Sequence, residues 1–387
     1  MNDQIEHAVR IMESFARDTG LSDPTQTPRR YLWTDAFAVC NFFQLAKSSG
    51  DEHYRTLALA LIDQVHDVLG RHHPDSDRQG WLSGLDNGEA RQHPTIAGLR
   101  IGKKLNERGI GEPFDEQREW DRDGQYFHYL TKWMHALNVA FEETGNPDSL
   151  RWAVELAHTA FAAFSYSVGP AQPKRMYWKM SVDLSRPLVP SMGQHDPLDG
   201  LLTFLELECN RSEAEDAGLT LASEIAALEL MCAGQSWATT DALGIGGLLA
   251  DTWKYLQIRQ RGVSTDALSV ARLIDDITWS VQQLLRENSL ALPAEYRLAF
   301  RELGLAIGLQ AIDRVFHAVA AHPEYVPKAD QADKQRDFLM RIAPLHTDIE
   351  AFWLASGNQR AASWREHLDI NRVMLASSLV PDRLLMI

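Results

Sequence analysis

Two distant stretches of the chain follow one pattern, and this repeat constrains the fold more than any other feature. SGDEHYRTLALAL (49–61) and TGNPDSLRWAVEL (144–156) each contain a Gly followed by Asp or Asn, with Ala eight residues and Leu eleven residues after the Gly. Gly is preferred just beyond the end of a helix, and Asp and Asn are preferred caps at the start of the next. Each stretch therefore predicts the turn of a helical hairpin, and SGNQRAASWREHL (356–368) is a weaker third copy.

The spacing of apolar residues extends this pattern along the chain. Residues 51–69 and 147–164 each place their apolar side chains on one face of a helix with a period of 3.6. The same reading predicts an additional N-terminal helix and six hairpins, at 32–48/51–69, 124–143/147–164, 197–209/212–232, 240–258/265–287, 294–309/311–322 and 335–355/359–377. Because no linker rich in Pro, Gly or Ser separates the hairpins, we expect a single all-α domain over residues 1–387.

Two segments depart from the helical period. Residues 70–122 are rich in Gly, Pro, Asp and Arg and predict a long loop of the kind that often carries function. Residues 174–184 (KRMYWKMSVDL) alternate between apolar and polar side chains. This alternation predicts one short strand with an apolar back and a charged front on which Arg175 and Lys179 point the same way.

Composition and charge exclude several classes of function. The 387 residues are 45% hydrophobic and 24% charged, which is typical of a globular protein with a substantial core, and the net charge of −15 argues against nucleic-acid binding. The longest apolar runs, such as LALALI (57–62), are too short to cross a membrane. The first 20 residues contain acids and no continuous apolar run, so we expect no secretory signal. Three cysteines in apolar helical contexts are expected to be reduced, which suggests the cytoplasm, and we expect no metal or cofactor.

Polar groups collect where the first helix of each predicted hairpin begins. In EWDRDGQYFHYLTKWMHAL (119–137), titratable side chains surround one Gly just before an apolar helix face. Comparable entries are YLWTDAF (31–37), SMGQHDPLDG (191–200), SWATTDA (236–242), PAEYRLAF (293–300) and LHTDIEAF (345–352). Each entry contains a carboxylate, and helix capping accounts for many of these acids. The GIGG sequence at 244–247 is interpreted as close helix packing.

Capping does not explain the aromatic and cationic residues in the same loops. Tryptophans collect near them, at positions 33, 81, 120, 178 and 237, together with His128, Arg175 and His195. Aromatic faces cover the apolar C–H faces of a sugar ring, while carboxylates, Arg and His bind hydroxyl or carboxylate groups. The pattern therefore favours a small saccharide or an oligosaccharide as the ligand.

These features together resemble the six-hairpin, (α/α)6-toroid superfamily of carbohydrate-active enzymes. That superfamily includes glycoside hydrolases, unsaturated-uronyl hydrolases and the N-acylglucosamine 2-epimerase family. The resemblance covers nearly the whole chain in architecture, and it implies a toroid with residues 174–184 as a strand over its mouth. Near the C-terminus, SWREHLDINR (363–372) supplies Trp364, His367 and Arg372, which is similar to a Trp, His and Arg grouping in the epimerases, although the spacing differs.

Hydrolysis of a glycosidic bond is the first functional hypothesis. It uses an acid that protonates the leaving oxygen and a base that activates water, with carboxylates about 6.5–9.5 Å apart for inversion. The candidate catalytic residues are Asp35, Asp121, Asp123, His128, His195 and Asp196. Of these, Asp123 and His195 are the leading pair, and one of Asp121 and Asp123 is expected to cap the helix that follows. The candidate substrate-binding residues are Trp33, Trp81, Trp120, Tyr126, Arg175, Tyr177, Lys179 and Asp199.

Two alternatives remain open at this point. A sugar 2-epimerase or isomerase would use a His pair, His128 and His195, with Arg175 and Lys179 stabilising an enolate. A non-catalytic toroid would bind a sugar or act as a scaffold, and would keep the aromatic lining without matched acids and histidines.

Overall fold

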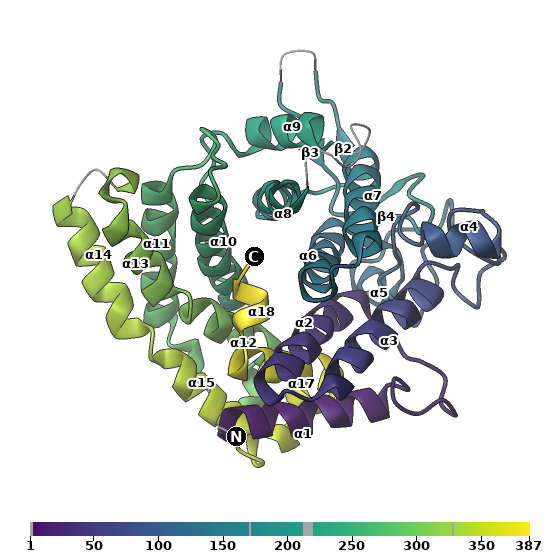
Figure 1. Cartoon of the computed structure of the whole chain (residues 1–387), viewed down its shortest axis with the longest axis horizontal. Coiled ribbons are helices and arrows are strands. Elements are labelled where there is room, and N and C mark those ends of the chain that lie inside the picture. The colour runs from purple at the N-terminus through teal and green to yellow at the C-terminus, as the bar shows by residue number, and fades with distance from the viewer. Residues whose placement is uncertain (1–2, 170–171, 212–219, 327–328) are drawn as a thin grey trace. The chain divides into compact units, whose positions relative to one another are not determined.

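Helices dominate the structure, which is a computed structural model that describes residues 3–169, 172–211, 220–326 and 329–387 (Figure 1). The long helices are α1 (Asp3–Asp18), α2 (Leu32–Ser49), α3 (Glu52–Leu69), α6 (Phe127–Thr144), α7 (Pro147–Phe164), α8 (Asp196–Asn210), α9 (Ala222–Cys232), α10 (Ala242–Gln260), α11 (Val270–Glu287), α12 (Ala299–Leu309), α13 (Ile312–Ala321), α14 (Ala329–Ile342), α15 (Leu345–Leu354) and α17 (Leu368–Leu379). The short ones are α4 (Asn87–Gln92), α5 (Glu116–Asp121), α16 (Ala362–Arg365) and α18 (Asp382–Leu385).

The predicted hairpin turns are confirmed for the two strongest copies of the repeat. Gly145 follows α6 in the left-handed region, with φ of 68°, and donates its N–H to the carbonyl of Phe141. Asn146 then caps α7 by accepting the N–H of Asp148, and Asp51 caps α3 in the same way. These contacts satisfy backbone groups that a helix end leaves unpaired, which is why the same short sequence recurs.

The C-terminal hairpin differs from its prediction. The helix predicted over 335–355 is two helices, α14 and α15, because the N-terminal neighbour of α15 is Pro344, which lacks a backbone N–H. Gly357, in the weak third copy, has φ of −59° and precedes a short 3-10 helix, so it does not end a helix in the left-handed region. The start of the helix predicted at 212–232 lies outside the described residues.

The chain divides into two compact units. The first comprises Met1–Phe15, Lys47–Gly50 and Cys232–Ile387, and its helices α10 and α12 lie side by side in Figure 1. A Cβ on Gly246 would lie 2.1 Å from the carbonyl oxygen of Gly304, and one on Gly308 would lie 2.2 Å from that of Gly246. Only glycine permits this approach, so the interpretation of GIGG as helix packing is confirmed.

One stretch of the first unit resembles a membrane span by composition. Residues 299–321 have a mean hydropathy of 1.3 over their most apolar window, and 72% of that window is buried inside the protein. This stretch contains α12 and α13, which supply core residues such as Leu303, Ala306 and Val315. A core helix pair accounts for the apolar composition.

The second unit comprises Ala16–Ala46 and Asp51–Met231, and in it α6 packs against both α7 and α8. Its three-stranded sheet has the order β1 (Gln125–Tyr126), β4 (Lys179–Met180) and β5 (Pro187–Val189), with both pairs antiparallel. A separate pair joins β2 (Ser165–Tyr166) to β3 (Arg175–Met176). The single strand predicted over 174–184 is therefore wrong, because this segment contributes two short strands to two different sheets. The prediction of one domain over 1–387 stays a prediction.

Candidate active site

The first turns of α6 and α8 lie next to each other in the second unit. His128 Nδ1, on α6, is 3.6 Å from Asp196 Oδ1, on α8. One helical turn further along, the hydroxyl of Thr131 donates to Asp199 Oδ2 over 2.5 Å. Gly200 lets the helices approach, since a Cβ there would lie 2.9 Å from the Phe127 ring. Polar side chains from the entries of two successive predicted hairpins therefore meet at one place, with both acids coming from α8.

Asp196 is a buried carboxyl held against its own loop. Its side chain is 7% exposed. The carboxyl packs closely against Gly193, where a Cβ would lie only 2.6 Å from Asp196 Oδ2, so a larger residue at 193 would clash with it. Burial and the negative charge of Asp199 raise the pKa of Asp196 to about 7, against a hydrogen bond from the Gly193 N–H and the charge of Lys132. Burial prevails because a helix N-terminus contributes only about 0.3–1 kcal/mol, less than one pKa unit.

Asp199 lies in the same turn of α8 but in a different environment. Lys132 Nζ donates to Asp199 Oδ1 over 2.6 Å, and Thr131 donates to the other oxygen. An ammonium and a hydroxyl that both donate to a carboxylate favour its charged form. The site thus pairs a carboxyl that is partly protonated at neutral pH with one that is held ionised.

His128 is neutral in this setting. Burial lowers the pKa of His128 to about 4, opposed by the charge of Asp199. Over the ranges that the structure describes, neither His128 Nδ1 nor Asp196 Oδ2 has a hydrogen-bond partner. Each unpaired buried polar atom costs about 1–3 kcal/mol, and such atoms in a folded protein call for a specific explanation. The ring of His128 is 28% exposed, so the pair lies just below the surface.

Aromatic rings surround His128. The ring of Tyr126 stacks on it with centroids 5.3 Å apart, and Tyr129 meets it edge to face at 4.9 Å. The indole of Trp178 is nearly parallel to the imidazole, at 6.3 Å and 16°. Burial raises the pKa of Tyr126 and of Tyr129 above the usual tyrosine value, so both phenols remain neutral. β1 and β4 produce this arrangement, because their register places Tyr126 opposite Lys179, the neighbour of Trp178.

Four of the residues predicted from the sequence come together here: His128, Asp196, Asp199 and Tyr126. His195 immediately precedes α8 and is half-buried, and its carbonyl accepts the N–H of Asp199 over 2.9 Å. Trp120 is 48% exposed and meets Trp178 edge to face at 5.1 Å, so it lies beside the site. Catalytic or binding roles for all of these residues stay predictions.

The structure does not support a substrate-facing Asp123. This carboxylate is fully buried and forms an ion pair with Arg100, and its Oδ1 accepts the N–H groups of Gly102 and Gly124. Asp121 is exposed at the end of α5. The prediction that one of the two caps α6 is wrong, because Tyr126 occupies the cap position and no side chain makes a capping bond there.

Three other predicted residues are buried against protein neighbours. Asp35 is 1% exposed, accepts the N–H of Tyr31 over 2.8 Å and lies 3.5 Å from Arg30. Trp33 is buried beside Phe37, with ring centroids 4.4 Å apart. Trp81 is buried, and its Nε1 donates to Asn87 Oδ1 over 2.9 Å. All three side chains are engaged in holding the second unit together.

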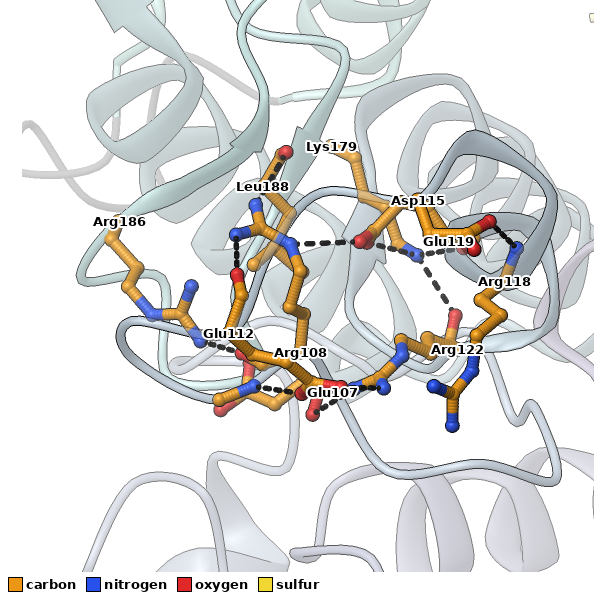
Figure 2. A network of polar contacts seen from close by, with 11 residues as sticks. Glu107, Arg108, Glu112, Asp115, Arg118, Glu119, Arg122, Lys179, Arg186 and Leu188 are labelled. Atoms are coloured by element: carbon orange, nitrogen blue, oxygen red, sulfur yellow. Dashed lines mark hydrogen bonds and ion pairs between the residues drawn. The ribbon is translucent and has the colours of Figure 1, made fainter.

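The predicted charged front of residues 174–184 is also corrected. Arg175 is exposed on β3, and Tyr177 stacks on Tyr166 at 4.3 Å. Lys179 is fully buried, however, and Figure 2 shows its ammonium directed at Glu119 and at the carbonyl of Arg122. Arg175 and Lys179 therefore do not form a common cationic surface.

Sequence reasoning missed three residues of this cluster: Tyr129, Thr131 and Lys132. It noted Trp178 among the loop tryptophans without naming it as a substrate-binding candidate. Thr131 and Lys132 lie three and four residues after His128, so helical spacing would have placed them on its face. Within the described ranges, no three His, Cys, Asp or Glu side chains converge as a metal site would require.

The C-terminal residues that resemble an epimerase grouping lie in the first unit. Trp364 is buried and stacks on Trp353 with centroids 5.6 Å apart. His367 precedes α17 and meets the ring of Phe300 edge to face at 5.7 Å.

No protein-family model and no curated protein sequence matches the chain. Among solved structures, the chain is similar to a GH76 α-mannanase from Bacteroides thetaiotaomicron, with 9% identity, a TM-score of 0.51 and coverage of 99% of this chain and 97% of the mannanase. This likeness over both full lengths decides the fold. The chain has the (α/α)6 toroid fold.

Other solved structures match with lower scores. A cellobiose 2-epimerase from Bacillus thermoamylovorans has 11% identity, a TM-score of 0.46 and coverage of 89% and 88% of the two chains. A D-mannose isomerase has 10% identity, a TM-score of 0.47 and coverage of 88% and 85%. The fold assignment rests on the mannanase, and at 9% identity that likeness leaves the chemistry to the residues of the site.

Proposed function

We propose that this toroid is a carbohydrate-active enzyme that hydrolyses a glycosidic bond with Asp196 and Asp199. The observation that carries this proposal is a pair of carboxyl groups in one helical turn whose surroundings drive their protonation apart. Burial raises the pKa of Asp196 to about 7, while Lys132 and Thr131 hold Asp199 as a carboxylate. Two titratable groups separated in this way supply an acid and a base or nucleophile at the same pH.

The spacing of the two residues suits a double displacement. Residues three apart on a helix have Cβ atoms about 5–6 Å apart, so their carboxyl groups can reach the separation of about 5–5.5 Å that retaining glycosidases use. In this scheme Asp196 protonates the glycosidic oxygen as the bond to the anomeric carbon breaks, and Asp199 attacks that carbon. Asp196 then accepts a proton from the water that displaces Asp199, which restores both groups.

The aromatic surroundings support a saccharide as the substrate. Tyr126 and Trp178 flank His128, and Trp120 continues this aromatic surface toward solvent. Such rings cover the apolar face of a pyranose while carboxyl and imidazole groups bind its hydroxyls. One of the solved structures with this fold is described as an α-mannanase, so mannosides are among the first substrates to test.

A second candidate, sugar isomerisation, is favoured by one specific contact. The unpaired Nδ1 of His128 lies 3.6 Å from the carboxyl of Asp196. A neutral imidazole can remove a proton alpha to a carbonyl, and a protonated carboxyl beside it can donate to the oxygen. His195 precedes Asp196 in the chain and remains the proposed second histidine.

The direct test is incubation with oligosaccharides and free reducing sugars, including mannosides, cellobiose and mannose, with products read by mass. We expect each cleaved bond to add the mass of one water, with retention of anomeric configuration in the first product by NMR. A product of unchanged mass would instead establish isomerisation. The Asp196→Asn variant is the negative control. If the wild-type protein changes none of the sugars, the hydrolase and isomerase proposals both fall and the binding-only alternative gains support.

The activity is expected to decline as pH rises through about 7. Asp196 must be protonated to donate, and the protonated fraction of a group falls about tenfold for each pH unit above its pKa. We therefore expect kcat/KM at pH 8 to be roughly a tenth of its plateau value. The measurement is kcat/KM between pH 4 and 9, with stability checked at each pH. A rate constant that stays level to pH 9 would rule out Asp196 as the acid.

A further inference from the structure

Two tryptophans outside the acid–base cluster form a surface that faces solvent. Trp178 is half-buried and lies nearly parallel to the ring of His128 at 6.3 Å. Trp120 meets Trp178 edge to face with centroids 5.1 Å apart and is 48% exposed. A row of rings therefore starts at His128 and ends at an indole that is half open to water. We call Trp120 and Trp178 the indole step.

A buried ion pair lies behind the indole step and joins its sequence neighbours. Lys179 follows Trp178, Glu119 precedes Trp120, and Lys179 Nζ is 2.9 Å from Glu119 Oε1. The same ammonium donates to the carbonyls of Glu119 and Arg122 over 2.7 and 2.8 Å (Figure 2). Because all three donor positions of the ammonium are used, the pair fixes the backbone of one tryptophan against that of the other.

The second oxygen of Glu119 is fixed as well. Arg108 Nε lies 3.0 Å from Glu119 Oε2, and its Nη2 donates to the carbonyl of Leu188 over 3.0 Å (Figure 2). Leu188 lies in β5, the neighbour of β4. The segment that carries Trp120 is thus attached to the sheet that carries Trp178.

This arrangement is difficult to explain by stability alone. Burial lowers the pKa of Lys179, with Glu119 acting against that shift, so the ammonium lies in surroundings that disfavour its charge. Buried ion pairs are often no more stable than apolar residues of the same volume. Here the pair holds a large apolar ring at the surface, where it gains little from burial. A surface that binds the flat apolar face of a ligand would account for both the buried ion pair and the exposed indole ring.

We propose that the indole step is a binding surface for a second ring of the substrate, next to the ring that reacts at Asp196. The preferred substrate is then a saccharide of two or more rings, and a monosaccharide fills only part of the site. This inference rests on the proposed function for the place where reaction occurs. The recognition itself requires only binding, so it can be tested separately.

The test compares binding of disaccharides and monosaccharides by calorimetry. Cellobiose and mannobiose are titrated into the wild type and into Trp120→Ala, with glucose and mannose as the one-ring probes. We expect Trp120→Ala to weaken the disaccharides about two- to tenfold, as for the loss of one ring contact, and to leave the monosaccharides unchanged. Trp120→Phe should recover part of the loss. Phe114→Ala is the matched control, because Phe114 is 56% exposed on the same segment.

The outcomes separate this inference from the proposed function. Equal effects on one- and two-ring probes, or no effect of Trp120→Ala, would overturn the second-ring surface even if the enzyme is active. Selective loss of disaccharide binding supports the surface even if the protein turns over no sugar, in which case only the proposed hydrolysis fails.

The role of the ion pair has a spectroscopic readout. Two indoles this close are expected to couple in circular dichroism, and Trp120→Ala should remove that signal while Phe114→Ala keeps it. The double variant Glu119→Gln with Lys179→Met removes both charges of this pair but also the carboxylate that Arg108 contacts, and its melting temperature shows whether it folds. We expect the folded double variant to lose both the coupled signal and the disaccharide preference. Retention of both would show that the ion pair does not position the rings. If the double variant does not fold, the same two measurements are made on Lys179→Arg, which keeps the charge but changes its geometry.

Discussion

Asp196→Asn is expected to lower kcat/KM by about two to four orders of magnitude, the usual effect of removing a positioned acid. The same change should stabilise the protein above pH 7. The folded state holds the pKa of Asp196 at about 7, above the ordinary value of 3.8, so ionisation of this carboxyl is unfavourable in the folded protein. Stability is therefore lost as pH rises from about 4 through about 7, and the full cost is at most about 4 kcal/mol for a shift of about three units.

The measurement is urea unfolding of wild type and variant at pH 5 and pH 8, beside kcat/KM. Asn cannot ionise, so the gain in the free energy of unfolding should be larger at pH 8 than at pH 5. Asp148→Asn is the matched control, since Asp148 is also in the first turn of a helix of the second unit but is 45% exposed. Full activity in Asp196→Asn would remove it from the mechanism, and equal stabilisation at both pH values would show that its charge is not the cause.

A stabilising but inactivating change is the expected signature of this site. Unpaired buried atoms such as His128 Nδ1 and Asp196 Oδ2 cost free energy, and a protein retains that cost where function requires it. A catalytic Asp196 can thus be distinguished from a structural one, because removing a purely structural carboxyl should destabilise the protein.

The helical hairpins could be predicted from the sequence because their signals are local. Gly145 with Asn146, and Gly50 with Asp51, act within a few residues of the turn they form. The close approach of α10 and α12 was likewise visible in GIGG. Pro344 is also a local signal, and it accounts for the break within the predicted helix 335–355.

The roles of the acids could not be predicted, because they depend on partners far away in the chain. Asp123 and Asp196 both lie at the entries of apolar helices, Asp123 before α6 and Asp196 in the first turn of α8. Asp123 forms an ion pair with Arg100, which lies 23 residues earlier in the chain. The ammonium of Lys132 acts on Asp196 only through its charge, because it is hydrogen-bonded to Asp199. Burial without an adjacent cation raises a carboxyl pKa, as it does for Asp196. The sequence identified the right helix entries without distinguishing the two environments.

Lys179 was predicted to be exposed, and its burial also depends on partners far away in the chain. Alternation in residues 174–184 placed it on an exposed front with Arg175. A buried ammonium becomes possible when a carboxylate and two carbonyls surround it, and these come from Glu119 and Arg122, roughly 60 residues earlier. The irregular register between Lys179 and Met180 also disrupts the simple alternation.

Asp123→Asn is expected to cost about 3–5 kcal/mol of stability, the usual result of leaving one member of a buried ion pair unpaired. Arg100 is 3% exposed and also donates to the carbonyls of Arg71 and Val68, so its guanidinium cannot turn to solvent without breaking those bonds. The side-chain oxygen of Asn can still accept the N–H groups of Gly102 and Gly124. The expected loss of stability therefore comes from removing the negative charge.

Because many proteins are stable by only about 5–15 kcal/mol, the Asp123→Asn variant should be compared with wild type by urea unfolding at low temperature. Asp382→Asn is the control, since Asp382 forms an ion pair with Arg314 but is 53% exposed, and the expected cost there is about 0–1 kcal/mol. The rate per folded molecule should fall far less in Asp123→Asn than in Asp196→Asn. If Asp123→Asn instead loses activity at unchanged stability, Asp123 returns as the catalytic carboxylate that the sequence first suggested, and the ion pair with Arg100 must open during the reaction.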